Sequence, residues 1–563
     1  MSTFPWHASY PASVPHDINP DVYPSLIDLL EDCFRKFADL DAYENMGKCM
    51  TYRQLDEQSR VFASFLQNEL KLQPGDRIAI QMPNVLQFPI VLFGAIRAGI
   101  TVVNTNPLYT PTEMRHQFND SGAKAVVILA NFAANLEEIL KETPIEHVIV
   151  TEIGDQIGGL KGMIVNFVVK RIKKMVPAYN LPTARSYKDV MKSAKEATYK
   201  RPQIASDHNA LLQYTGGTTG VSKGAMLTHR NMVANLEQVS GWMGTSNLEL
   251  GKEIFITALP LYHIFAFTVN AFLCAKLGAK SVLITNPRDM KGFVKELSKQ
   301  PYTFITGVNT LFNGLLNAPG FAHVDHSHVK VAIAGGMALQ RFVAEKWKEV
   351  TGVPVAEGYG LTETSPVLCV NPLNEQMRIG SIGLPIPSTD IVMLDDDGKE
   401  VPHGEKGELC AKGPQVMKGY WNRPEDTEKS FINGYFKTGD IAIQEPDGFI
   451  RIVDRKKEMI LVSGFNVYPN EIEDCIVSMD KVLEAGVIGV PDAKSTEAVK
   501  AYVVKADPSL TEEEVMAHCK ENLTGYKRPK YIAFTKELPK SNVGKIMRRI
   551  LKENDLKENT YEG

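Results

Sequence analysis

YTGGTTGVSKGAMLTHRN, residues 214–231, carries the strongest signal in this chain. Its closely spaced glycines let the backbone turn tightly and bring N–H groups close to an anion. Hydroxyl groups accompany them, and a lysine adds a compact positive charge suited to phosphate oxygens. The segment therefore predicts a polyphosphate site made of Thr215, Gly216, Gly217, Thr218, Thr219, Gly220 and Lys223.

This loop differs from the common P-loop of nucleoside triphosphatases. The P-loop motif ends in Gly-Lys-Ser/Thr, whereas the order here is Ser222-Lys223-Gly224. The simplest triphosphatase interpretation is therefore excluded. A flexible Gly/Thr-rich turn without a ligand is the alternative.

Short β-branched runs lie before and after the loop, with helical stretches between them. Apolar runs that alternate with helices are typical of mostly parallel sheets covered by helices, where ligands collect at the strand C-terminal ends. The predicted strands occupy residues 77–82, 100–105, 123–129, 146–151, 254–260, 280–285, 303–308 and 330–336.

The sequence predicts an α/β fold in two units, because 563 residues exceed one ordinary core. A large N-terminal domain, residues 1–453, would hold two helix-covered, mostly parallel sheets and a β subdomain at about residues 379–453. A small, mobile α+β lid domain, residues 454–563, would follow. Charged residues at 454–457 interrupt two apolar runs, which is typical of a hinge between moving bodies.

Composition narrows the function classes. A hydrophobic content of 44% and a charged content of 23% are those of a soluble globular protein, and a net charge of -4 argues against nucleic-acid binding. The seven scattered cysteines form no CxxC pair, so neither a disulfide framework nor a zinc site is expected. With no signal-peptide pattern and no spanning apolar run, we expect a cytoplasmic protein.

Two segments after the loop carry groups suited to a nucleotide. In EGYGLTETSP, residues 357–366, a tyrosine between glycines can lie against a flat heterocycle, and the Thr362-Glu363 pair can meet a phosphate and its Mg²⁺. In NGYFKTGDIA, residues 433–442, Asp440 can accept hydrogen bonds from ribose hydroxyls. A core tyrosine, a solvated glutamate and an Asx-turn are the alternatives.

A third segment, PKSNVGKIMRR at residues 539–549, places Lys545 after Gly544. Surface lysines are usually solvated and inert. Together, however, these segments resemble the adenylate-forming (ANL) superfamily of acyl-CoA synthetases, adenylation domains and beetle luciferases. Their order over nearly the whole chain is that of the family. NTNPLYTPTE, ITGVNTLFNGLL, SGFNVYPNEIED and LTGYKRPK are similar to bacterial long-chain-fatty-acid-CoA ligases.

The resemblance implies a nucleotide site. The loop from Thr215 to Lys223 would hold the ATP phosphates, and Tyr359 would stack on adenine. Thr362 would contact the α-phosphate, and Glu363 would ligate Mg²⁺.

It also implies roles for residues nearer the C-terminus. Asp440 and Arg455 would bind the ribose, and Lys545 would neutralise charge between the substrate carboxylate and the α-phosphate. Asp454 would be the hinge. Rotation there would withdraw Lys545 and bring Gly464, with its neighbours at 463 and 465, to a pantetheine channel, where the absence of a side chain suits a narrow passage.

Acyl specificity depends on the shape of an apolar tunnel rather than on a motif. Candidate linings lie in residues 261–272, 305–316 and 334–339, and they include His263, Phe267 and Gly335. Phe267 stands where some long-chain enzymes of the family have a tryptophan gate. Core packing explains these apolar residues equally well.

Residues 157–180, IGGLKGMIVNFVVKRIKKMVPAYN, combine apolar and basic side chains. This composition suits the surface of an anionic bilayer, and peripheral contact with the cytoplasmic face of the inner membrane would help an enzyme whose substrate dissolves in lipid. A basic helix on a soluble insertion is the alternative.

The resulting hypothesis is an ATP- and Mg²⁺-dependent ligase that converts a long-chain fatty acid and coenzyme A to acyl-CoA through an acyl-adenylate. Within the superfamily, the alternatives are a medium-chain, aryl or fatty-acyl-AMP ligase, with an amino-acid-adenylating module less favoured. A non-catalytic acyl- or nucleotide-binding regulator is the alternative from another class. The oligomeric state is open, with a homodimer among the arrangements considered.

Overall fold

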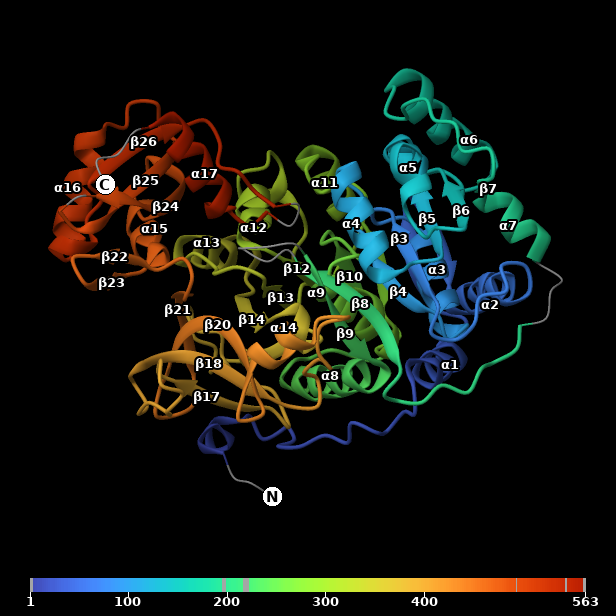
Figure 1. Ribbon diagram of the computed structural model, residues 1–563, viewed down its shortest axis with the longest axis horizontal. Coiled ribbons are helices and arrows are strands. Elements are labelled where there is room, and N and C mark those ends of the chain that lie inside the picture. The colour runs from blue at the N-terminus through green and yellow to red at the C-terminus, as the bar shows by residue number, and fades with distance from the viewer. Residues whose placement is uncertain (1–3, 195–198, 216–221, 493, 542–543, 560–563) are drawn as a thin grey trace.

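The computed structural model describes residues 4–194, 199–215, 222–492, 494–541 and 544–559, whose strands form four sheets. Two large sheets and their helices make the body, a smaller sheet makes the β subdomain, and the C-terminal unit lies beside them (Figure 1). The mixed α/β architecture with largely parallel sheets and a small C-terminal unit confirms the predicted fold class.

One sheet of the body has seven strands in the described residues. Its neighbours run parallel except β8 and β9, which form an antiparallel hairpin. The strands in spatial order are β7 (Arg185–Ser186), β6 (His147–Thr151), β5 (Ala125–Leu129), β3 (Arg77–Gln81), β4 (Thr101–Asn104), β8 (Asn209–Thr215) and β9 (Lys223–Thr228).

The second sheet has nine strands among the described residues, with a parallel centre and antiparallel edges. Every one of the eight strands predicted from apolar runs lies in one of these two sheets, shortened by one to three residues. The strands in spatial order are β16 (Leu384–Pro385), β15 (Val367–Val370), β14 (Val355–Gly360), β13 (Val331–Ala334), β12 (Phe304–Gly307), β10 (Ile254–Thr257), β11 (Lys280–Leu283), β1 (Asp41–Asn45) and β2 (Lys48–Thr51).

Helices cover both sheets, and several begin at a polar cap. Thr51 and Thr228 each accept a backbone N–H three residues on, and that third residue returns a bond, so both helices start in a capping box. The body helices are α1 (Leu26–Lys36), α2 (Tyr52–Asn68), α3 (Gln87–Arg97), α4 (Pro111–Ser121), α5 (Ala133–Ile139), α6 (Gly159–Phe167), α7 (Tyr187–Ser193), α8 (His229–Trp242), α9 (Ile264–Ala266), α10 (Cys274–Lys276), α11 (Met290–Leu297), α12 (Asn309–Leu316) and α13 (Arg341–Thr351).

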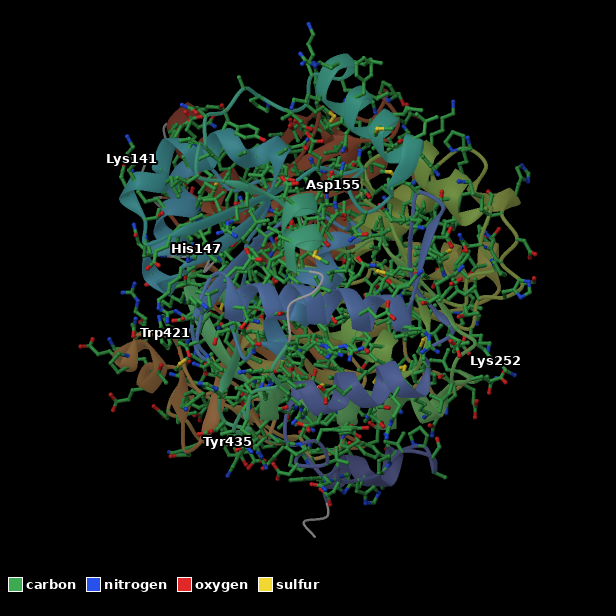
Figure 2. All side chains as sticks on the ribbon, turned by 90° about the vertical axis from the view of Figure 1, so that its right-hand side faces the viewer. Lys141, His147, Asp155, Lys252, Trp421 and Tyr435 are labelled. Atoms are coloured by element: carbon green, nitrogen blue, oxygen red, sulfur yellow. The ribbon has the colours of Figure 1, made fainter. Side chains whose placement is uncertain are left out.

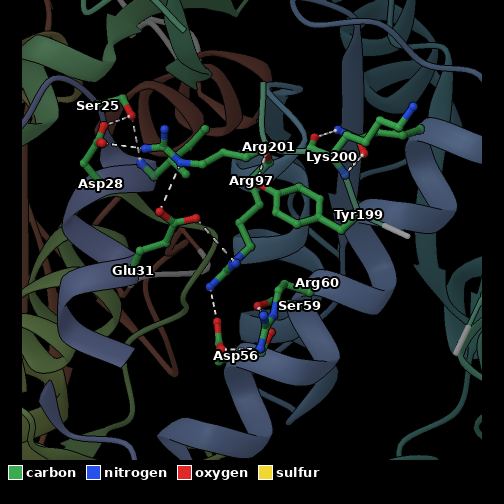
Figure 3. A network of polar contacts seen from close by, with 12 residues as sticks. Ser25, Asp28, Glu31, Asp56, Ser59, Arg60, Arg97, Tyr199, Lys200 and Arg201 are labelled. Carbon is green, nitrogen blue, oxygen red and sulfur yellow. Dashed lines mark hydrogen bonds and ion pairs between the residues drawn. The ribbon is translucent and has the colours of Figure 1, made fainter. Parts of the chain in front are cut away.

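Every residue of α3 is buried, and its last residue, Arg97, sits in a polar network (Figure 3). The Arg97 guanidinium pairs with Asp56 of α2 and lies 3.9 Å from Glu31 of α1. Arg201 also binds Glu31, at 3.0 Å, and the Tyr199 hydroxyl donates to the Arg97 carbonyl. A buried guanidinium requires such partners, so the network ties the segment that leads into β8 to three helices.

The outer helix α6 is seated on the body by a very close backbone approach. A Cβ on Gly162 would lie 2.4 Å from the Gly154 carbonyl oxygen, and the Gly154 N–H donates to Asn166 Oδ1 at 2.6 Å. Figure 2 faces this side of the molecule and labels Asp155, which pairs with Lys188 of α7 at 3.1 Å. The position of α6 is therefore set by specific contacts.

The β subdomain contains five strands in the described residues: β17 (Asp390–Leu394), β18 (Lys406–Lys412), β19 (Phe431–Ile432), β20 (Tyr435–Gln444) and β21 (Ile450–Arg455), with α14 (Pro424–Lys429). The sequence pattern indicated that the charged residues 454–457 interrupt two strands. Asp454 and Arg455 instead complete β21, because both have partners there, and only the residues after them form a turn.

The C-terminal unit, which we call the lid, has its own hydrophobic core. An antiparallel pair, β24 and β25, carries β26 in parallel on one side. Its elements are β22 (Ile460–Val462), β23 (Phe465–Val467), β24 (Val482–Asp492), β25 (Thr496–Lys505), β26 (Tyr531–Thr535), α15 (Pro469–Val477), α16 (Glu512–Asn522) and α17 (Arg548–Glu558).

Candidate active site

The hairpin β8–β9 carries the ends of the predicted phosphate loop. Thr215 and Lys223 pair across the two strands, and residues 216–220 of the prediction lie outside the described residues. Lys223 Nζ is 3.0 Å from Asp426 of α14 and 5.3 Å from the ring centre of Tyr420. The Lys223 ammonium group is therefore held by the Asp426 carboxylate and by the face of the Tyr420 ring.

Thr362 and Glu363 lie on a single 3₁₀ turn, Thr362–Thr364, that packs against the β8–β9 hairpin. Glu363 is buried, and its Oε1 accepts a hydrogen bond from the Tyr420 hydroxyl at 2.7 Å. Burial raises the pKa of Glu363, while the Tyr420 bond opposes that rise. Tyr420 therefore links this carboxylate to Lys223.

Asp440 and Arg455 face each other across the paired strands β20 and β21. Asp440 Oδ1 lies 2.8 Å from Arg455 Nε, and Oδ2 accepts the Tyr359 hydroxyl at 2.6 Å. Burial raises the pKa of Asp440, and the Arg455 cation and the Tyr359 bond oppose this. The three residues predicted around the nucleoside therefore form one connected group.

Lys545 lies on the lid, next to a residue that contacts the body. The Lys545 N–H donates to Ser541 Oγ at 3.1 Å. Gly544 has φ +84°, and a Cβ there would lie 2.3 Å from Thr310 Oγ1 on α12, so Gly544 lies against the body.

Lys545 lies in a mixed charge environment. Burial lowers the pKa of Lys545, the Arg455 cation adds to the decrease, and the carboxylates of Glu458 and Asp440 oppose it. A bound anion can replace these two carboxylates as the negative charge that the Lys545 ammonium group faces. The site can thus meet negative charge from both the body and the lid.

Asp454, the predicted hinge, is fully buried at the end of β21. Its Oδ1 accepts the Arg455 N–H at 2.7 Å, and its Oδ2 accepts the Asn470 N–H at 2.8 Å in the first turn of α15. Burial raises the pKa of Asp454 to about 6. One carboxylate therefore joins the β subdomain to the lid.

Gly464 lies with Ser463 at the turn between β22 and β23, both at positive φ. A Cβ on Gly464 would meet no atom within 4 Å among the described residues. Phe465 is 54% exposed and stacks on Tyr526 with ring centres 4.6 Å apart. In this arrangement the turn faces open space, and its role beside pantetheine stays a prediction.

The three predicted acyl-pocket residues lie around α9 and the end of β13. His263 Nδ1 accepts the Phe265 N–H at 3.4 Å, and burial lowers the pKa of His263 to about 4, so its imidazole is neutral at pH 7. A Cβ on Gly335 would lie 3.0 Å from the Phe265 ring. Phe267 is fully buried against Phe272 in the main core. Their contact with an acyl chain stays a prediction.

Sequence reasoning missed three residues of this site. Tyr420 and Asp426 follow the β18 strand in VMKGYWNRPEDT, where only the aromatic after a glycine gave a signal. Arg548 lies in the segment that supplied Lys545 but was passed over. Each gains its partners through contacts distant in sequence, which no local pattern contains.

Comparison with known families accounts for this arrangement. Residues 30–421 match the AMP-binding enzyme model, and residues 471–545 match the AMP-binding enzyme C-terminal domain. The chain belongs to the AMP-binding enzyme family. The second match ends at Lys545.

Relatives and solved structures agree with this family. The long-chain-fatty-acid–CoA ligase of Escherichia coli O6:H1 is 56% identical to this AMP-binding enzyme over 97% of the chain and 98% of the relative. The ligase of the same name from Yersinia pestis is also 56% identical, over 99% of each chain. A crystal structure of the anthranilate CoA ligase AuaEII with anthranoyl-AMP shares the fold, with a TM-score of 0.83 at 24% identity, covering 95% of this chain and 99% of that one.

Proposed function

We propose that this protein activates long-chain fatty acids with ATP and transfers the acyl group to coenzyme A. The observation that supports this most strongly is the connected group of Tyr359, Asp440 and Arg455, whose charges act on Lys545 of the lid. Near-complete coverage by relatives named long-chain-fatty-acid–CoA ligase supports the substrate class.

In the first half-reaction a fatty-acid carboxylate attacks the α-phosphorus of ATP and expels pyrophosphate, leaving an acyl-adenylate. Two anions must approach each other, so the site has to position them and disperse charge. Lys545 would neutralise the reacting oxygens, Thr362 would donate to the α-phosphate, and Lys223 would bind the departing phosphates. Tyr359 would stack on adenine, while Asp440 would accept the ribose hydroxyls.

Glu363 fits a Mg²⁺ ion that is also bound by ATP. Its buried carboxylate has a hydrogen bond to Oε1 from Tyr420, and no group of three ligating side chains surrounds it in the part of the chain that the structure describes. Mg²⁺ in nucleotide sites commonly takes one or two carboxylates and completes its shell with phosphates and water. When bound, the ion would neutralise phosphate charge; Glu363 would hold it, and Tyr420 would orient Glu363.

In the second half-reaction the coenzyme A thiol attacks the acyl carbonyl and AMP leaves. The lid would rotate about Asp454, which withdraws Lys545 and brings the turn at Gly464 to the site. This proposal agrees with the exposed turn, because Gly464 and Phe465 have no role at the nucleotide in the present arrangement.

We also propose that α6 and the turn after it contact the cytoplasmic surface of an anionic membrane. No helix in the described residues is long and apolar enough to span a bilayer, so the contact would be peripheral. The close contact between Gly154 and Gly162 fixes one side of α6 against the body. Six apolar side chains of this segment are each more than half exposed: Leu160, Met163, Ile164, Phe167, Ile172 and Met175. Nearby basic residues supply charge complementarity with anionic lipid: Lys161, Lys170, Arg171, Lys173 and Lys174.

Purified protein with ATP, Mg²⁺, coenzyme A and fatty acids of graded length tests the function. We expect AMP and thioester in equal amounts, with a maximum for long chains. Pyrophosphate release with acyl-adenylate as the product, and without thioester, would favour a fatty-acyl-AMP ligase. A maximum at medium or aryl acids would favour the corresponding ligase. No turnover would favour a binding regulator. A homodimer and a cytoplasmic location stay predictions, to be checked by light scattering and cell fractionation.

A further inference from the structure

Arg548, the first residue of α17, is the centre of a buried polar cluster in the lid. Its side chain is 12% exposed. Nε lies 2.9 Å from Glu473 Oε1 and Nη2 lies 2.6 Å from Glu473 Oε2, which is a bidentate pair. Nη1 also binds Glu458 and Nη2 binds Asn470, while Nη1 lies 3.7 Å from Asp454 Oδ1.

These partners lie on both sides of the hinge. Asp454 is the last residue but one of β21 in the β subdomain, and Glu458 belongs to the turn after that strand. Asn470 and Glu473 lie on α15 of the lid. One planar guanidinium therefore contacts the last strand before the hinge, the hinge turn and the first lid helix. The fork geometry of arginine allows this, whereas a lysine offers a single point charge.

The cluster is costly without its cation. Asp454, Glu458 and Glu473 are 0%, 15% and 11% exposed at the side chain, and three carboxylates so close together repel each other in a poorly solvated space. Glu473 Oε1 also accepts the Val487 N–H at 2.7 Å, so this acid cannot turn away without breaking a second bond. Arg548 therefore holds α15 against the hinge.

Arg548 also fixes the end of the segment that carries Lys545, residues 539–547, which we call the arm. Residues 540 and 546 form a β-bridge, and Met547 N donates to the Pro539 carbonyl at 2.8 Å, so the two ends of the arm are held together. Arg548 follows it directly. With Arg548 bound at the hinge, Gly544 lies against Thr310, and Lys545 lies in the charge environment of Asp440.

We propose that Arg548 is a positioning residue for acyl-adenylate formation: by bridging Asp454, Glu458 and Glu473 it holds the lid in the arrangement that presents Lys545 to the nucleotide. This inference rests on the proposed function. The contact with Asp454 crosses the hinge and would be lost when the lid rotates. Arg548 therefore favours the arrangement for the first half-reaction and is not needed for the second.

Two half-reactions measured on the full chain test this proposal. Pyrophosphate release from ATP and a long-chain fatty acid without coenzyme A reports adenylation, and thioester formation from supplied acyl-adenylate and coenzyme A reports the second step. Arg548→Gln removes the charge and part of the fork. Arg549→Gln is the matched control, because the adjacent Arg549 is exposed and, among the residues that the structure describes, pairs only within its own helix, with Glu553 at 3.0 Å.

We expect Arg548→Gln to lower kcat for adenylation about tenfold or more with KM for ATP within about threefold, because the nucleotide contacts remain while Lys545 is misplaced. Thioester formation should stay within about twofold, which also shows that the lid is folded. Arg548→Lys should recover part of the adenylation rate. Arg549→Gln should match the wild type in both assays.

Equal losses in the two half-reactions would overturn the proposal, because they would make Arg548 a residue of general lid stability. Unchanged adenylation in Arg548→Gln would overturn it as well. If the wild type itself released no pyrophosphate with any fatty acid, the proposed function would fail instead, so the two failures are distinguishable.

Discussion

Lys223 Nζ lies 3.0 Å from Asp426 Oδ1, so a carboxylate occupies the place where the phosphate-loop cation would meet ATP. The two side chains are 38% and 35% exposed, and ion pairs this accessible contribute at most about 1 kcal/mol. A polyphosphate can therefore displace Asp426. The ion pair therefore orients Lys223 for a phosphate without binding it strongly.

Asp426→Asn should lower KM for ATP about twofold, because the phosphates no longer compete with a carboxylate worth about 0.5 kcal/mol. Steady-state kinetics with varied ATP measures this. Glu428→Gln, an exposed acid on the same helix, is the control and should leave KM unchanged. A rise in KM for Asp426→Asn would mean that Asp426 orients Lys223 productively.

Tyr359→Phe keeps the ring that would stack on adenine and removes the hydroxyl that binds Asp440. A buried acceptor left without its donor costs about 1–3 kcal/mol, so affinity for ATP should fall about tenfold. Calorimetric titration with a non-hydrolysable ATP analogue measures the change. Tyr435→Phe, which loses an equivalent bond to Asp390 elsewhere in the β subdomain, should bind normally.

Lys545→Ala should abolish adenylation while leaving the conversion of supplied acyl-adenylate to thioester nearly intact. The ammonium group supplies charge only when carboxylate and α-phosphate approach, and removal of such a stabiliser costs about 100-fold or more. Pyrophosphate and thioester are followed separately. Lys540→Ala, on the same arm but paired with Glu484, is the control. Similar losses in both steps would contradict a lid with two working positions.

Asp454 should make stability depend on pH in a defined window. Its pKa is about 6 in the folded protein against a usual value of 3.8, so the folded chain binds more protons between these values. The stabilisation that Asp454 contributes through its raised pKa is therefore present below about pH 4 and is lost as pH rises to about 6. A pKa difference of about two units corresponds to about 3 kcal/mol in the free energy of unfolding.

Asp454→Asn should remove this part of the slope. Urea titrations of both proteins between pH 4.5 and 7 give the difference in free energy of unfolding, which should move in favour of the variant up to about pH 6 and then level off. Asp480→Asn, at an exposed position, should follow the wild type. Parallel curves for Asp454→Asn and wild type would show that this carboxyl does not titrate there.

Ile164→Glu combined with Phe167→Glu should weaken binding to vesicles that contain anionic lipid, because two apolar contacts are replaced by charges of the wrong sign. Co-sedimentation at low and high salt measures this. Leu250→Glu, at an exposed apolar position outside α6, is the control. Unchanged vesicle binding by the double variant would assign the apolar row to another role.

Much of the body could be predicted from sequence because its strands are apolar β-branched runs with both faces buried. β10, β12 and β13 were all recognisable for this reason. The lid boundary at residue 454 stays a prediction, but the strand before it was read as too short. Asp454 and Arg455 looked like an interruption, yet they extend β21 because Asn470 and Asp440 bind them. A charge can occupy a buried strand when distant partners satisfy it.

Residue chemistry indicated the phosphate loop, the Thr362-Glu363 pair and Asp440, whereas the roles of Arg455, Asp454 and Lys545 came only through resemblance. Nothing local indicates that Tyr420 would bind Glu363 or that Asp426 would hold Lys223, since each pair is distant in sequence and meets only in the folded chain. Phe267 illustrates the opposite problem. An apolar residue in a packed core and one lining an acyl tunnel have the same sequence pattern.

Arg455 follows Asp454 directly, yet it completes β21 and its guanidinium binds Asp440 on the neighbouring strand of the same subdomain. A lid turning about Asp454 would therefore withdraw Lys545 and leave this pair in place. The first-step catalyst would depart while the ribose stayed bound. An activated acyl group anchored in this way would wait for the incoming thiol instead of diffusing away.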